Sequence, residues 1–192
     1  MSAAAAQRTR PDRPLQAFLR ARIKPGERLF GVVDAARGLE LAEAAKDRSD
    51  FTRSHGTLMR GPLAPFVQHV APHLVEIDID TTYVDTWAGS LGQAAGILLV
   101  TSAAPAELAA HLRSLFVVTD EAGEKYSFRF YDPRVTRLFL PTCDETQLRE
   151  FFGPVRLVIV ESTQRGTLLV YHVGGECVQM AIEALPSPAR RS

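Results

Sequence analysis

The sequence predicts a single α/β domain with a mixed, partly antiparallel sheet and flanking helices. Apolar runs of strand length alternate with segments of helical periodicity, and the last part of the chain is typical of an antiparallel meander. A chain of 192 residues is also long enough for one sizeable core and short for two domains. We expect a tail with a possible short helix in residues 1–27, the domain in residues 28–183 and a second tail in residues 184–192.

The composition is that of an ordinary globular protein. Basic and acidic side chains number 22 each, so we expect no whole-molecule attraction to nucleic acid or to an anionic membrane. Cys143 and Cys177 stand far apart and in no metal-binding spacing, which indicates free thiols. Because no apolar run approaches the roughly 20 residues of a membrane helix and no signal-peptide core follows the start, we expect a cytoplasmic protein.

The first part of the chain alternates between helices and strands. Residues 15–23 form an amphipathic pattern that we expect to pack back on the domain. The apolar run at residues 28–35, with a helix after it, indicates a buried strand and a crossover unit. The segments that follow are a short strand at 51–59, a strand at 71–79, a capped helix at 80–89, a buried strand at 96–102 and a helix at 102–115.

The second part contains a hairpin, two helices and the meander. Turn chemistry at residues 120–124 predicts a hairpin between strands at 116–118 and 126–131. The segments that follow are a helix from Pro133 that Pro141 ends, a helix that Asp144 caps and Gly153 ends, and strands at 155–160, 167–173 and 177–182, with Gly174-Gly175 as the last turn.

Two groups of residues carry the most chemistry. They are Phe128, Arg129, Phe130, Tyr131, Asp132, Pro133 and Arg134, and further along Phe151, Phe152, Gly153 and Pro154. In a strand, Phe128, Phe130 and Asp132 share one face, opposite Arg129 and Tyr131. Asp132 can cap the next helix and pair with Arg134. We interpret the first group as a capped strand-to-helix junction, and an active-site role for Arg129, Asp132 or Arg134 stays open.

Together with Leu29 to Ala35 and Trp87-Ala88-Gly89 before them, these two groups resemble the signature of the type VI secretion effector adaptors. The resemblance implies a non-enzymatic adaptor or chaperone that binds a toxic effector and helps to load it on the VgrG or PAAR spike protein. The possible partner contacts are Trp87, Arg113, Arg129 and Arg134. Family members commonly carry a longer helical lobe after Pro154, whereas strands and a tail are expected here.

Templates for catalysis are missing from the sequence. We find no phosphate-binding loop, no dinucleotide-binding glycine pattern and no nucleophile elbow. His55, His69 and His73 are poorly spaced for a metal site, and Cys143 has no identifiable His partner, although a helix start there would lower its pKa. We therefore expect no catalytic, cofactor-binding or metal-ligating residue. The alternatives are an immunity or general protein-interaction module, and a hydrolase whose site is dispersed in the sequence.

Overall fold

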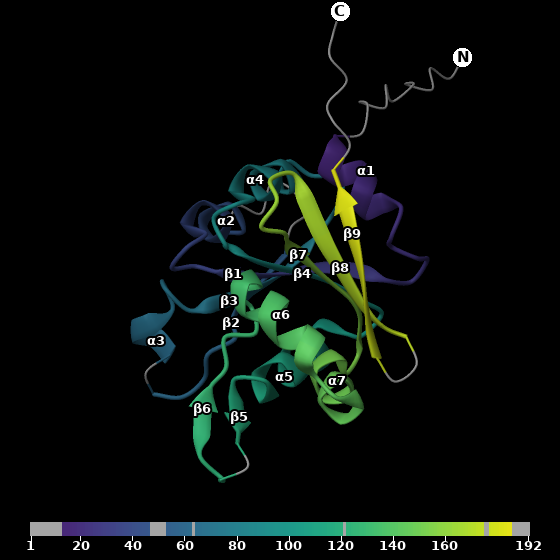
Figure 1. Cartoon of the computed structure of the whole chain (residues 1–192). Coiled ribbons are helices and arrows are strands. Elements are labelled where there is room, and N and C mark those ends of the chain that lie inside the picture. The colour runs from purple at the N-terminus through teal and green to yellow at the C-terminus, as the bar shows by residue number, and fades with distance from the viewer. Residues whose placement is uncertain (1–12, 47–52, 63, 121, 175–176, 186–192) are drawn as a thin grey trace, which may run out of the picture.

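The computed structural model describes residues 13–46, 53–62, 64–120, 122–174 and 177–185 (Figure 1). The helices are α1 (Pro14–Arg20), α2 (Leu39–Ala44), α3 (Ala64–Val67), α4 (Tyr83–Ser90), α5 (Pro105–Ser114), α6 (Pro133–Phe139) and α7 (Glu145–Phe152), with a 3-10 turn η2 (Leu140–Thr142). The strands are β1 (Arg28–Asp34), β2 (Arg53–Thr57), β3 (Pro72–Ile77), β4 (Gly96–Thr101), β5 (Val117–Thr119), β6 (Lys125–Ser127), β7 (Val155–Glu161), β8 (Thr167–Gly174) and β9 (Cys177–Ala184).

Seven of the strands form one sheet in the order β2-β3-β1-β4-β7-β8-β9. The single α/β domain is confirmed, but every described pairing in this sheet is antiparallel, so its predicted mixed character is wrong. The reason lies in the connection after β1. Helix α2 connects β1 to β2. Strand β3 lies between these two strands and is antiparallel to both, so the expected crossover does not join neighbouring parallel strands.

The sheet separates two hydrophobic layers. Leu29 and Val33 of β1 belong to the layer that α1, α2 and α4 cover, whereas Phe30 and Val32 belong to the layer of α5, α6 and α7 (Figure 1). Strand side chains alternate between faces, so one apolar run supplies both layers. Gly31 lets the sheet approach helix α4, because a Cβ at this position would lie only 2.5 Å from the indole Cζ3 of Trp87.

The N-terminal helix packs back on the domain, as expected. Leu15, Phe18 and Leu19 are buried in the layer of α2 and α4, and the guanidinium of Arg22 lies 3.6 Å from the centroid of the Phe18 ring. Residues 1–12 and 186–192 of the predicted tails, and Gly175 of the predicted last turn, lie outside the described residues. Among the described helices, none has the length and apolarity needed to cross a bilayer.

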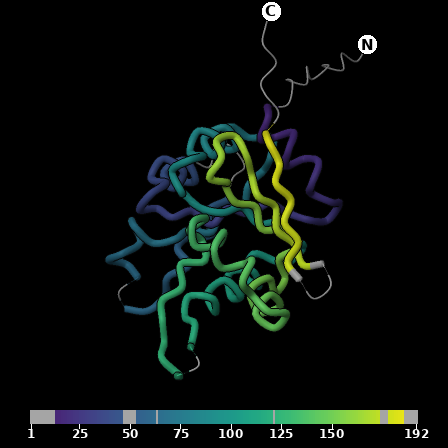
Figure 2. Tube along the Cα trace, viewed as in Figure 1, coloured from purple at the N-terminus to yellow at the C-terminus, as the bar shows by residue number. Residues whose placement is uncertain are grey.

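The predicted hairpin is present but shorter than expected. Strands β5 and β6 pair from Val117–Ser127 to Thr119–Lys125, and the Asp120 carboxylate accepts backbone hydrogen bonds from Ala122 and Glu124 within the turn. Figure 2 shows this hairpin extending away from the rest of the trace. The strand expected at residues 126–131 stops at Ser127, because the chain then turns into the core.

Candidate functional site

The signature residues after β6 form a capped junction into α6. Asp132, 2% exposed, caps the helix by accepting a hydrogen bond from the Arg134 amide at 2.9 Å, and Pro133 takes the first helical position. The Arg134 guanidinium also donates hydrogen bonds to this carboxylate, from Nε to Oδ1 at 2.9 Å and from Nη2 to Oδ2 at 2.5 Å. The capped junction predicted from the sequence is therefore confirmed.

A second buried carboxylate lies beside this junction, at the end of β1. The Asp34 side chain is fully buried; its Oδ1 accepts a hydrogen bond from the Ala36 amide at 3.1 Å, and its Oδ2 has no hydrogen-bond partner. The nearest cation is Arg129, whose Nη2 lies 3.5 Å from Oδ2. We call Asp34, Asp132, Arg129 and Arg134 the charge cluster. Asp34 was not among the predicted site residues, and a carboxylate ending a buried strand is its sequence signal.

The two carboxylates of the charge cluster differ in their ionisation. Burial raises the pKa of Asp34, and the amide of Ala36 and the charge of Arg129 offset only part of that effect. Burial also acts on Asp132, but the hydrogen bonds and charge of Arg134 outweigh it, so the pKa of Asp132 is lowered. Both guanidiniums stay about half exposed, at 51% for Arg129 and 49% for Arg134. Arg134 thus compensates the charge of Asp132, Arg129 compensates that of Asp34 only in part, and both arginine side chains still reach solvent.

The aromatic residues of the signature build the core beneath this cluster. The ring centroid of Phe128 lies 4.6 Å from that of Phe139 and 6.3 Å from that of Phe151, so the two signature groups meet in one cluster. Phe130 is fully buried. Tyr131 is also buried, which corrects the prediction that it faces away from Phe130, because strand alternation ends at Ser127.

The second signature group ends α7 and closes it against α5. Asp144 caps this helix as predicted and forms a capping box with Gln147, and Gly153 ends the helix with φ +47°. A Cβ on Gly153 would lie 2.4 Å from Cε1 of His111, whose ring nitrogen Nε2 is 3.0 Å from the Phe151 carbonyl oxygen. Burial lowers the pKa of His111, with the Phe151 carbonyl opposing it. These contacts therefore fix the packing of α7 against α5.

The four expected partner contacts lie in three different environments. Trp87 is only 4% exposed and packs under Gly31, so its indole is not presented at the surface. Arg129 and Arg134 come together in the charge cluster. Arg113 lies apart from both, in a cleft of about 410 Å³ that also receives Arg60. We call this the arginine cleft, and the sequence did not single out Arg60.

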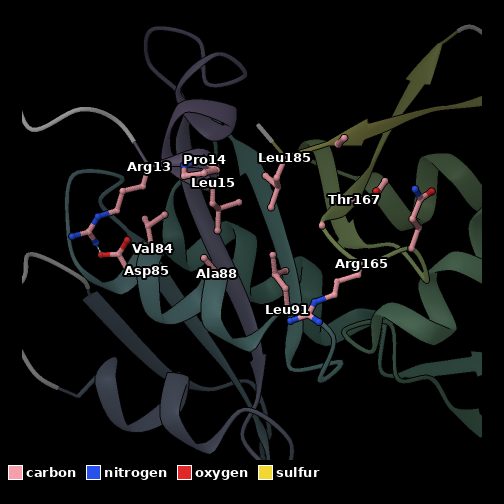
Figure 3. A pocket seen from close by; sticks show the side chains of 13 residues that line it. Arg13, Pro14, Leu15, Val84, Asp85, Ala88, Leu91, Arg165, Thr167 and Leu185 are labelled. Carbon is pink, nitrogen blue, oxygen red and sulfur yellow. Dashed lines mark ion pairs between the residues drawn. The ribbon is translucent and has the colours of Figure 1, made fainter. Parts of the chain in front are cut away.

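A larger cavity, of about 640 Å³, opens on the other side of the sheet (Figure 3). Its walls come from α1, α4, the turn before β8 and the end of β9, and they include Leu15, Val84 and Leu185. Arg13 and Asp85 form an ion pair at one side of it (Figure 3). The rest of the lining is mostly apolar, with Gln164, Arg165 and Thr167 as further polar residues.

Reactive groups suggested by the sequence do not converge. Among the described residues, no group of three His, Cys, Asp or Glu side chains is arranged to hold a metal ion. His55 pairs with Glu76, with Nε2 and Oε2 3.2 Å apart, while His73 contacts the Gln68 carbonyl oxygen at 2.7 Å. Burial, with the charge of Asp144, raises the pKa of Cys143 to about 11, opposite to the lowering considered for a helix start.

Comparison with known proteins gives one match. The family model described as a domain of unknown function, DUF4123, matches residues 29–150, which is more than half of the chain. No curated protein matches, and no solved structure matches. The matched region runs from β1 through the charge cluster and into α7. This chain therefore belongs to the DUF4123 family.

Proposed function

We propose that this DUF4123 domain is a non-enzymatic adaptor that binds a toxic effector and helps to load it on the VgrG or PAAR spike protein of a type VI secretion system. The resemblance of its signature to that of effector adaptors supports this proposal, and the matched family region covers most of the same stretch. The bound partner is a polypeptide, and the site is a surface rather than a catalytic pocket.

One observation carries the proposal: the β5–β6 hairpin presents apolar side chains to solvent. All six of its strand residues are exposed, and Val117 and Tyr126 are 55% and 54% exposed. A projecting hairpin of this kind buries little surface of its own domain, so its apolar side chains gain most when a partner covers them. Tyr126 lies opposite Val118 in the hairpin, and an aromatic side chain beside a β-branched one is typical of a protein-binding surface.

The signature itself supports a scaffold role. Its aromatic residues are buried and Asp132 caps α6, so the residues that carry the resemblance maintain the domain. Partner contacts are then made by exposed residues that the domain places around this scaffold, and the hairpin lies directly before the signature in the chain.

The test is co-purification with the toxin and the VgrG protein encoded beside this chain. The wild-type protein is expected to form a complex, and the double variant Val117→Ser, Tyr126→Ser is expected to lose it while keeping its thermal stability. Leu39→Ser is the matched control, because Leu39 is 60% exposed on the opposite layer. If neither neighbour binds the wild-type protein, the proposal is wrong.

Mapping the bound toxin fragment separates an adaptor from an immunity module. An adaptor is expected to hold the region outside the catalytic domain and to leave the toxin's activity intact. Capture of the catalytic domain with inhibition would instead identify an immunity protein.

A further inference from the structure

The arginine cleft lies between β2, α3 and α5. Arg113 enters it from the end of α5, Arg60 from the loop after β2, and Ala64 and Pro65 of α3 form another wall. The Arg113 side chain is held in place, since its Nε donates to the Leu58 carbonyl oxygen at 3.3 Å. The cleft is therefore a defined site that spans elements far apart in the sequence.

The two guanidiniums in this cleft have no counter-charge within the described part of the chain. Neither Arg60 nor Arg113 forms an ion pair with a described carboxylate, whereas Arg134 and Arg156 each do. Burial and then the charge of Arg60 lower the pKa of Arg113, which reflects the cost of holding two cations at one cleft. His55 on the β2 wall is already paired with Glu76. A site that accumulates uncompensated positive charge is suited to an anion.

We propose that the arginine cleft binds the carboxylate of an aspartate or glutamate side chain in the bound polypeptide. This inference rests on the proposed function, because it assumes that a polypeptide lies across this surface. A guanidinium can bind a carboxylate with two parallel hydrogen bonds, and two guanidiniums lining one cleft favour a charged group over a neutral one.

Exposed apolar residues stand close in the chain to residues that line the cleft. Phe66, next to Pro65 of the wall, is 74% exposed, and Val70 is 42% exposed. On the other side, Arg113 ends α5 shortly before Val117 of the exposed hairpin. These exposed apolar residues lie within a few positions of cleft-lining residues in the chain, so the partner segment that we propose carries apolar residues beside its acidic one.

The test uses a probe that does not depend on identifying the effector. Titration calorimetry measures binding of hexaglutamate to the full chain, with hexalysine and inorganic phosphate as comparison ligands. We expect hexaglutamate to bind, and Arg113→Gln or Arg60→Gln to weaken it about tenfold, the size of one charged hydrogen bond. Arg165→Gln is the matched control, because Arg165 is an exposed arginine outside this cleft and makes the same charge change.

The salt dependence of hexaglutamate binding is measured on the wild-type protein, so this result does not depend on whether a variant folds. Raising the salt from about 0.1 M to about 1 M shortens the screening length from about 10 Å to about 3 Å, so hexaglutamate binding is expected to fall sharply. Equal weakening by Arg165→Gln, or binding that resists salt, would overturn the proposal, and phosphate binding as tight as hexaglutamate would make the cleft a free-anion site. Loss of co-purification with intact hexaglutamate binding would count against the adaptor function alone.

Discussion

The charge cluster and the arginine cleft each contain two arginines, but only the arginines of the charge cluster lie beside described carboxylates. In the charge cluster, Arg134 neutralises the buried Asp132 and Arg129 lies beside the buried Asp34. In the arginine cleft, Arg60 and Arg113 meet no described carboxylate. An arginine inside a family signature can thus stabilise the fold by pairing with a buried carboxylate. An arginine outside the signature can remain without a carboxylate partner and bind a ligand instead.

The physical reason is the cost of burying charge. A carboxylate at 0–2% exposure requires hydrogen bonds and a nearby cation, so Asp34 and Asp132 engage the arginines next to them. An exposed guanidinium such as that of Arg60 carries no such requirement and can stay unpaired until a ligand arrives. Substitutions in the signature should therefore change stability, and substitutions in the cleft should change binding.

The largest effect is expected from Gly153→Ala. Alanine is strained at φ +47°, and its Cβ would meet the His111 ring at 2.4 Å, so we expect a loss of about 3 kcal/mol in the free energy of unfolding. Denaturant unfolding measures this loss. Gly166→Ala is the control: φ is +73° but nothing lies within 4 Å, so about 1 kcal/mol is expected. Equal losses would mean that the His111 contact is unimportant.

The next effect is expected from Asp132→Ala, which removes both the α6 cap and the partner of Arg134. We expect a loss of about 2 kcal/mol, against about 1 kcal/mol for the exposed cap Asp144→Ala in α7, because only the first also breaks a charged pair. Thermal and denaturant unfolding provide both values. Unchanged stability with lost partner binding would instead place Asp132 on the interaction surface.

A pH dependence is expected to distinguish the two buried carboxylates. Burial raises the pKa of Asp34, so the native state binds the proton of this carboxyl more readily than the unfolded state does. Above its native pKa, the ionised Asp34 therefore lowers the free energy of unfolding. Asp34→Asn is therefore expected to be most favourable relative to wild type at neutral pH, and to lose that advantage as the pH falls through the native pKa of Asp34 toward 3.8.

Asp132 has the opposite effect on the pH dependence of the free energy of unfolding. Its native pKa is lowered, so its contribution is present above the ordinary value of 3.8 and disappears as the pH falls through the native value. Unfolding curves from neutral to acid pH test the statement for Asp132 when Asp132→Ala is compared with wild type, and the statement for Asp34 when wild type is compared with Asp34→Asn. A difference between these two proteins that does not change with pH would contradict the assignment for Asp34.

The smallest effect is expected in the arginine cleft. Arg60→Gln relieves like-charge repulsion, so we expect it to raise the free energy of unfolding by about 0.3 kcal/mol, while Arg134→Gln, which removes the partner of Asp132, lowers it. The opposite signs, measured at low salt, would sharpen the contrast between the two regions. Destabilisation by Arg60→Gln would mean that its charge is compensated within the fold.

The sequence predicted much of the fold because its signals act over short distances. Asp132 capping α6 and Asp144 with Gln147 capping α7 join residues within one helical turn, and the apolar run of β1 foretells burial on both faces. The same local logic failed after Ser127, where Tyr131 turns into the core instead of continuing the strand alternation.

What the sequence determined by itself is therefore most of the helices and strands, their caps and the apolar side chains available for a core; the short helix α3 was not among them. Only the tertiary structure decided the strand order, which inserts β3 between β1 and β2 and makes the sheet antiparallel. It also decided which arginines are compensated, because Asp34 meets Arg129, and Arg60 meets Arg113, across long stretches of chain. Caps and periodicities depend on near neighbours, whereas charge compensation depends on residues that only the folded chain brings together.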